Sequence, residues 1–363
     1  MRRLLTVIGT RPQYIKYAAM AGRLSTDFHE IVVDTAQHYD EALSSKFKQE
    51  FLIGADFRTL DTTGLEGSAR FAAMLSQLDT VIGDLNPDGL LCFGDTDSTL
   101  AAGMAAAIRG VPLIHVEAGE RSRHADGSRM AGWTVPEESN RVIVDHLSSL
   151  LLCTTADAVE NCQLESCPGD TVITGDIMYD LFLAGKDNLP DTDAVLHKLG
   201  MQSQPYYFCT VHRPVNTDDA KRLGDLLATL GTLPYPVLLP MHPRTEKRIR
   251  EFGLDINPGS VHALPPLSHA ETLALASGAE RVLTDSGGLT REAFFCGVPS
   301  LCLDDVTAWH ALCRSGWCTL TGADDSAIRS ALHSPTPSGY DASMFGDGHA
   351  AEKIAVALTA FFA

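Results

Sequence analysis

Short, nearly continuous apolar runs alternate with longer segments of helical periodicity along this 363-residue chain. Segments such as 97–109, 137–148 and 219–231 have the apolar spacing of helices. The apolar runs lie at 4–9, 31–36, 90–94, 113–117, 150–154, 171–174, 206–211, 236–240, 261–264, 281–284, 300–303 and 318–321. Parallel strands covered on both faces have such sequences, and strand–helix alternation is typical of right-handed βαβ units. We therefore predict an α/β protein with doubly wound parallel sheets.

The length and one polar region predict two domains. A chain of 363 residues exceeds what one compact core usually holds. The sequence turns polar between about 170 and 205, so we expect a Rossmann-like domain at 1–170 and a second at 171–345, with a cleft between them. The last segment, 350–363, has helical spacing and is expected to complete the first domain.

Composition excludes several classes of protein. Hydrophobic residues make up 45% and charged residues 20%, as in ordinary globular proteins. No stretch of 18 apolar residues occurs, and the first apolar run ends at Gly9 without a cleavage signal, so we expect a cytoplasmic protein without a membrane span. A net charge of −18 disfavours nucleic acids and anionic membranes as partners. The nine cysteines show no Cys-x-x-Cys spacing, so neither a disulfide scaffold nor a metal site is expected.

Polar clusters follow the first two predicted strands. Ligands of open parallel sheets bind beyond the carboxyl ends of the strands. The sequence Gly9-Thr10-Arg11-Pro12, with Lys16 one helical turn later, is suited to an anion, although a strand-to-helix turn with a surface arginine is the simpler interpretation. Gln37-His38-Tyr39-Asp40 fits the rim of a ligand site or a hydrogen-bonded turn equally well.

Three carboxylates follow later strands or begin a helix. Asp95 ends an apolar strand, Glu117 ends the next strand, and Glu137 stands in the first turn of a predicted helix. Each alone is explained by helix capping or by the helix dipole. Three acids on one rim would raise one another's pKa, which suits acid–base chemistry.

The second half repeats this arrangement with basic and small residues. Its strands are followed by His212-Arg213, by His242-Pro243-Arg244 and by Asp285-Ser286-Gly287-Gly288, and Glu292 lies one turn into the next helix. Free backbone N–H groups at a helix N-terminus bind anions. Each loop alone fits an ordinary turn, but three such loops at one edge favour a nucleoside diphosphate site.

Together these motifs resemble the non-hydrolysing UDP-N-acetylglucosamine 2-epimerases, which have the glycosyltransferase-B fold. The resemblance covers nearly the whole chain, in order and at compatible spacing. The matching segments are Val7 to Pro12, Gln37 to Asp40, Gly94 to Thr99, His115 to Gly119, Pro136 to Arg141, Asp145 to Ser148, Thr210 to Arg213, His242-Pro243 and Asp285 to Gly288.

The resemblance implies an isomerase that needs no cofactor and no metal. Such enzymes eliminate UDP from the sugar to leave a glucal and add UDP back with the opposite configuration at C2. The implied catalytic residues are Asp95, Glu117, Glu137 and His212. The implied substrate-binding residues are Arg11, Lys16, Gln37, His38, Arg141, Arg213, His242, Ser286, Gly287, Gly288 and Glu292. A homodimer is also expected from the family.

Four positions depart from the family pattern. Val215 replaces an acid, Arg291 stands where the family has glutamate, and Asp304 and Trp309 replace two arginines. Losing arginine and gaining tryptophan changes both charge and stacking surface. We therefore expect the fold of the family, with a sugar substrate that differs from the family's usual one. We also expect a place in antibiotic or polysaccharide biosynthesis.

Three other functions remain open on the sequence. A hydrolysing 2-epimerase would release N-acetylmannosamine and UDP, and a glycosyltransferase of the same fold would pass the sugar to an acceptor. A binding or regulatory protein that has lost catalysis is the third, supported by Val215 and Asp304.

Overall fold

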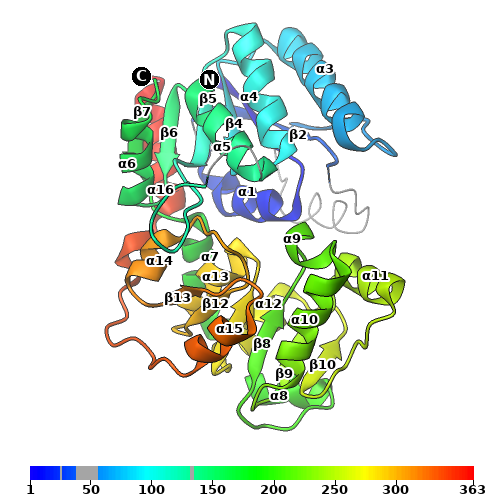
Figure 1. Cartoon of the computed structure of the whole chain (residues 1–363). Helices are drawn as coiled ribbons and strands as arrows, with labels where there is room; N and C mark the ends of the chain where they lie inside the picture. Colours follow the sequence, from blue (N-terminus) through cyan, green and yellow to red (C-terminus); the bar gives the residue numbers. More distant parts are fainter. Residues whose placement is uncertain (25–26, 38–55, 131–134) are drawn as a thin grey trace. The chain divides into compact units, whose positions relative to one another are not determined.

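The structure is a computed structural model, and it forms two compact units (Figure 1). The described residues are 1–24, 27–37, 56–130 and 135–363. His38, Tyr39 and Asp40, which belong to one of the predicted polar clusters, lie outside them. None of the helices in the described part of the chain combines the length and apolarity that a membrane span needs.

The first unit comprises Met1–Arg121, Ala131–Leu183 and Ser343–Ala363. Among its described residues are seven strands, which are all parallel and lie in the order β3-β2-β1-β4-β5-β6-β7. They are β1 (Arg2–Ile8), β2 (Phe28–Asp34), β3 (Asp56–Thr59), β4 (Gly89–Phe93), β5 (Leu113–Ala118), β6 (Leu150–Cys153) and β7 (Asp170–Ile173). The order reverses between β1 and β4, and such a switch point is where open α/β sheets bind ligands.

Helices cover both faces of this first sheet, which explains the apolar strand sequences. One hydrophobic cluster lies under α1, α7 and α16, and the other under α3, α4 and α5. The helices of this unit are α1 (Arg11–Leu24), α3 (Gly67–Leu85), α4 (Asp97–Arg109), α5 (Pro136–Leu147), α6 (Ala156–Leu164), α7 (Ile177–Gly185) and α16 (Ala350–Phe361).

The first unit ends later than the sequence analysis expected. β7 pairs in parallel with β6, so the strand at 170–173 belongs to the first sheet, and the division falls after Leu183 instead of at 170. The C-terminal helix α16, drawn in red in Figure 1, packs on α1 through Ile354 and Leu358. The chain therefore returns to its first unit at its end.

The second unit comprises Ser122–Met130 and Ala184–Ala342. Its six parallel strands lie in the order β10-β9-β8-β11-β12-β13, with the switch point between β8 and β11. They are β8 (Tyr207–Thr210), β9 (Val237–Pro240), β10 (Val261–Leu264), β11 (Arg281–Thr284), β12 (Ser300–Cys302) and β13 (Cys318–Leu320).

Helices again cover both faces of the second sheet. Apolar residues of α10, α11 and α15 pack on one face, and those of α8, α12 and α13 pack on the other. The helices are α8 (Thr192–Lys198), α9 (Pro214–Thr217), α10 (Ala220–Gly231), α11 (Pro243–Phe252), α12 (His269–Ser277), α13 (Gly287–Phe295), α14 (His310–Arg314) and α15 (Asp325–Leu332), with a 3-10 turn at Lys186–Asn188. A second 3-10 turn, Ala342–Phe345, lies where the chain passes back into the first unit.

A short excursion of the chain belongs to the second unit although first-unit residues flank it. The backbone N–H of Arg123 donates to the carbonyl of Thr307 at 2.9 Å, and the N–H of Thr307 donates back to Arg123 at 3.0 Å. Residues 122–130 therefore pack beside the loop that contains Asp304 and Trp309.

Candidate active site

Gln13 joins the two turns that flank the switch point of the first sheet. Its side-chain oxygen accepts from the backbone N–H groups of Gly9 at 2.9 Å and Thr10 at 3.2 Å. Its amide nitrogen donates to the carbonyl of Phe93 at 2.8 Å and to the hydroxyl of Thr99 at 3.0 Å. Gln13 is buried, and it fixes the turn after β1 against the turn after β4.

Gly9 permits close approach between these turns. A Cβ atom at this position would collide with the hydroxyls of Thr35 and Ser98. Ser98 in turn donates to the side-chain oxygen of Gln37 from its backbone N–H at 2.9 Å and from its hydroxyl at 2.6 Å. Gln37 therefore lies at the N-terminus of α4, whereas Arg11 is exposed at the first residue of α1.

Lys16 and Glu117 form an ion pair at the carboxyl edge of the first sheet. Both side chains are largely buried, with exposed fractions of 10% and 14%. Gly94 lies against the pair, because a Cβ there would stand 3.4 Å from a carboxylate oxygen of Glu117. The strand β5 is irregular between Val116 and Ala118, and this bulge turns Glu117 out of the ladder.

Asp95 has a cationic partner of its own. Its carboxylate is paired with the guanidinium of Arg141 on α5, and its carbonyl accepts from the side-chain amide of Asn140 at 2.9 Å. Arg141 also contacts the carboxylate of Glu138 at 3.2 Å. Burial lowers the pKa of Arg141, but Asp95 and Glu138 outweigh that effect and raise it above its ordinary value.

The structure places Glu137 apart from these pairs. Glu137 is exposed in the first turn of α5, and no hydrogen bond or ion pair of the described residues joins it to Asp95 or Glu117. The neighbouring Glu138 is buried and faces Arg141. Glu137 and Glu138 are adjacent in the sequence, and their positions around the helix α5 decide which of them is exposed and which is buried.

In the second unit, one buried carboxylate organises the loop after β8. Asp285 is 1% exposed and accepts from the backbone N–H groups of His212 and Arg213, each at 2.9 Å. It also contacts Nδ1 of His212 at 2.9 Å and the side-chain amide of Asn216 at 3.1 Å. Burial raises the pKa of Asp285, but these donors, led by His212, hold it below its ordinary value.

His242 lies next to His212, with ring centroids 5.3 Å apart. Nδ1 of His242 accepts from the backbone N–H of Arg244 at 3.2 Å and caps α11. Nδ1 therefore holds a lone pair, and the hydrogen of the neutral ring is on Nε2. Each of the two neighbouring imidazoles therefore has a contact at its Nδ1.

The N-terminus of α13 follows directly after Asp285. The hydroxyl of Ser286 accepts from the N–H of Leu289 at 3.3 Å, and Gly287 and Gly288 form the first turn. Free N–H groups and the helix dipole at such a turn attract anions. One turn further, Glu292 contacts Nε2 of His269 at 2.7 Å.

Two residues that depart from the family pattern, Asp304 and Trp309, contact these loops. Asp304 is paired with Arg213 at 2.8 Å. The indole N–H of Trp309 donates to the carbonyl of Gly287 at 2.8 Å, and the guanidinium of Arg291 lies 4.6 Å from the centre of the indole ring. Asp304 and Trp309 therefore make contacts of their own within the second unit.

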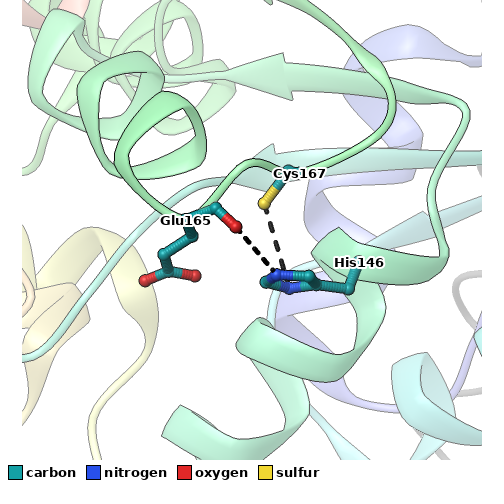
Figure 2. Close-up of side chains that lie close together, drawn as sticks. All are labelled: His146, Glu165 and Cys167. Atoms are coloured by element: carbon teal, nitrogen blue, oxygen red, sulfur yellow. Dashed lines mark hydrogen bonds between the residues drawn. The ribbon is translucent and has the colours of Figure 1, made fainter.

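A cluster of His146, Glu165 and Cys167 has the residue types of a metal site (Figure 2). Figure 2 shows that the carboxylate of Glu165 points away from the imidazole, and a carbonyl oxygen faces the ring. That carboxylate binds Arg121 through both oxygens, at 2.9 and 2.8 Å. Its bonding is satisfied within the protein, so we assign no ion to the cluster.

Two α/β units with polar loops at the carboxyl ends of their parallel strands define a protein of the glycosyltransferase-B fold type. The sequence model of the UDP-N-acetylglucosamine 2-epimerase family matches residues 21–359. The chain belongs to this family, whose members are epimerases and hence isomerases.

Two curated relatives illustrate the range of the family. The UDP-2,3-diacetamido-2,3-dideoxy-D-glucuronate 2-epimerase of Pseudomonas aeruginosa is 34% identical, with 97% of this chain and 98% of the relative covered. A UDP-N-acetylglucosamine 2-epimerase homolog of Methanococcus maripaludis is 30% identical over the same shares.

Solved structures agree with this assignment. The UDP-GlcNAc 2-epimerase of Methanocaldococcus jannaschii, in complex with UDP-GlcNAc and UDP, matches with a TM-score of 0.85 at 27% identity, covering 99% of each chain. The Neisseria meningitidis enzyme bound to UDP-GlcNAc matches with a TM-score of 0.82 at 26% identity, covering 99% of this chain and 100% of that one.

Proposed function

We propose that this protein is a non-hydrolysing 2-epimerase that interconverts UDP-N-acetylglucosamine and UDP-N-acetylmannosamine, or a closely related pair of UDP-2-acetamido sugars. The observation that carries the proposal is the pairing of Asp95 with Arg141 and of Glu117 with Lys16 at one edge of the first sheet. Each carboxylate has a cation within reach, which suits groups that gain and lose protons while charge develops on a sugar.

The proposed reaction proceeds through elimination and re-addition. The C1–O bond breaks, its electron pair leaves with UDP, and positive charge develops on the sugar ring. A carboxylate of the first unit takes the C2 proton, and the C–H electron pair forms the C1–C2 double bond of a glucal. A proton then adds to the opposite face of C2, and the UDP oxygen bonds again to C1, so no electrons are gained or lost overall.

The second unit is proposed to hold the nucleotide. Ser286, Gly287 and Gly288 offer the N-terminus of α13 to the diphosphate, and His212 and His242 offer imidazole nitrogens beside it. These groups stabilise the negative charge of departing UDP through hydrogen bonds, because backbone N–H groups and imidazoles need no reorganisation as the charge develops. We propose further that Glu292, which contacts His269, binds the ribose.

A second substrate is favoured by one relative. The Pseudomonas aeruginosa relative, the more similar of the two described above at 34% identity, is named for a diacetamido glucuronate instead of N-acetylglucosamine. Asp304 pairs with Arg213 and Trp309 donates to the carbonyl of Gly287, so both contact loops of the proposed nucleotide site, and both replace arginines of the family pattern. A substituted UDP-2-acetamido sugar is therefore the alternative substrate to test.

The test is a comparison of two substrates by proton and phosphorus NMR without added cofactor. UDP-N-acetylglucosamine and UDP-2,3-diacetamido-2,3-dideoxyglucuronate are incubated separately with the enzyme. The expected result is a manno-configured UDP-sugar from one of them, with the diphosphate intact. Free sugar with an equal amount of UDP would contradict the non-hydrolysing proposal, and two unchanged spectra would contradict the proposed substrate class.

A further inference from the structure

Glu117 has a backbone conformation that side chains rarely adopt. Its φ is 68°, in the left-handed region, although it lies within the strand β5. Non-glycine residues persist in that region only where the surrounding structure determines it. Something must therefore hold the chain on both sides of Glu117.

One buried carboxylate contacts both sides of this residue. Oδ1 of Asp145 lies 2.7 Å from Nδ1 of His115, two residues before Glu117, and Oδ2 accepts from the backbone N–H of Gly119, two residues after it, at 3.0 Å. Asp145 is fully buried on α5. Its pKa lies below the ordinary value because, although burial raises it, hydrogen bonding and charge from His115 and Arg121 lower it further.

The Gly119 end of this arrangement has no space for a side chain. A Cβ there would collide with the carbonyl of Ala158, and the φ of Gly119 is 80°. The carbonyl of Gly119 also accepts from the side-chain amide of Asn161 at 2.9 Å. The turn after Glu117 is therefore held through its N–H and its carbonyl.

The hydrogen bonds of His115 fix its protonation. Nε2 lies 2.7 Å from the carbonyl oxygen of Gly94, and Nδ1 lies 2.7 Å from the carboxylate of Asp145. Both partners are acceptors only, so both ring nitrogens must carry hydrogen. His115 is then a fully buried imidazolium beside an ionised carboxylate.

The residues beyond Asp145 are compatible with a positive charge on His115. Arg121 contacts Asp145 at 2.7 Å and binds both oxygens of Glu165, so cations and carboxylates alternate from His115 to Glu165. A charge in the interior is tolerated where it is paired and hydrogen-bonded. The carbonyl that His115 holds belongs to Gly94, the residue directly before Asp95. The network thus reaches the backbone beside both proposed catalytic carboxylates.

We propose that Asp145 and a doubly protonated His115 are positioning residues that hold Glu117 in its left-handed conformation and fix the turn leading into Asp95. The catalytic importance of that geometry rests on the proposed function. Neither residue touches the substrate in this proposal, and both act through the backbone.

The protonation of His115 is tested on the wild-type enzyme. Histidine side chains are labelled with ¹⁵N, and His115→Gln identifies the resonances of this ring. The expected result at pH 8 is two protonated ring nitrogens for His115. A neutral ring with one bare nitrogen would overturn the proposal, and this measurement needs no activity.

The positioning role is tested with Asp145→Asn. We expect faster exchange of the Gly119 amide hydrogen and a fall in kcat of about 100-fold with little change in KM, because small misplacements of reacting groups have effects of that size. Asp176→Asn is the matched control, since Asp176 is equally buried in the same unit and accepts from a backbone N–H, that of Met178 at 2.8 Å. It should lose stability and keep kcat.

The positioning role of Asp145 and the catalytic role of Glu117 can be refuted independently. Unchanged kcat in Asp145→Asn with unchanged exchange at Gly119 would overturn the positioning role. Full activity of Glu117→Gln would instead remove the catalytic role of Glu117 from the proposed function, whatever the state of the His115 ring.

Discussion

Two carboxylates at the edge of the first sheet have largely buried cationic partners. These two pairs are where we expect single substitutions to change turnover. Glu117 is paired with Lys16, and Asp95 with Arg141. Replacing either acid by its amide keeps the shape of the side chain and removes the group that exchanges protons. The effect should therefore fall on turnover more than on folding.

We expect Asp95→Asn and Glu117→Gln each to lower kcat by about 100-fold or more, the usual contribution of a positioned acid or base. Epimerisation is followed by proton NMR, and circular dichroism checks the fold. Glu160→Gln, an exposed acid on α6, is the control and should keep full turnover. Near-normal turnover in both site variants would contradict the assignment.

A buried acid in the core of the first unit gives a prediction about stability and pH. Glu30 is 6% exposed on β2 and accepts from the hydroxyl of Thr6 at 3.1 Å. Burial raises its pKa from an ordinary 4.5 to about 7, against the hydrogen bonds from Thr6 and Tyr17, which lower it. The folded state therefore binds the proton more tightly than the unfolded state does.

The stability that Glu30 contributes is fully present below about pH 4.5 and is lost as the pH rises through about 7. Glu30→Gln removes this titration. Relative to wild type, we expect the variant to gain up to about 3 kcal/mol at pH 8, since one pKa unit corresponds to about 1.4 kcal/mol. Urea unfolding at pH 5 and pH 8 measures the difference, and an equal change at both values would refute the explanation.

At the scale of elements, two helices of the second unit begin with the same type of cap. Ser286 caps α13 beside the proposed diphosphate site, and Ser268 caps α12, where its hydroxyl accepts from the N–H of Glu271 at 3.2 Å. Only the first is expected to affect nucleotide binding. Comparing Ser286 with Ser268 therefore distinguishes the loss of a helix cap from the loss of anion binding.

We expect Ser286→Ala and Ser268→Ala each to lower the free energy of unfolding by about 1 kcal/mol, as loss of a serine cap usually does. Calorimetric titration with UDP should show weaker binding for Ser286→Ala and wild-type binding for Ser268→Ala. Equal affinities in the two variants would contradict the placement of the diphosphate at α13.

Elements with a strong apolar pattern were predictable from the sequence. Every strand of the second sheet was anticipated within about two residues, a usual margin for strand ends. β3 was missed because Asp56–Thr59 is a short, mostly exposed edge strand without an apolar run. Such a strand is defined by its pairing with β2, which local sequence does not encode.

The candidate site was predictable as a set of loops and less so as a set of contacts. The loops after β4, β5, β8 and β11 follow from the strand pattern. Gln13 is not predictable as a site residue, because it looks like an ordinary helix residue until its amide is seen joining two turns. The sequence also predicts Glu137 as a catalytic residue, and this stays a prediction, because the structure shows only that Glu137 is exposed while Glu138 contacts Arg141.

In the whole molecule, the points at which the chain passes from one unit to the other are the least predictable feature. The division after Leu183 and the assignment of residues 122–130 to the second unit both depend on backbone pairing between distant segments. The return of α16 to the first unit was accessible from sequence because its helical pattern stands apart after a polar loop.

The whole enzyme is proposed to remove and replace the C2 proton of a UDP-2-acetamido sugar. The most direct measurement is proton NMR of the wild-type enzyme with UDP-N-acetylglucosamine in heavy water, without cofactor. We expect a manno-configured UDP-sugar that carries deuterium at C2. Epimerisation that retains the original C2 hydrogen would contradict it, because proton exchange with solvent would then be no part of the reaction.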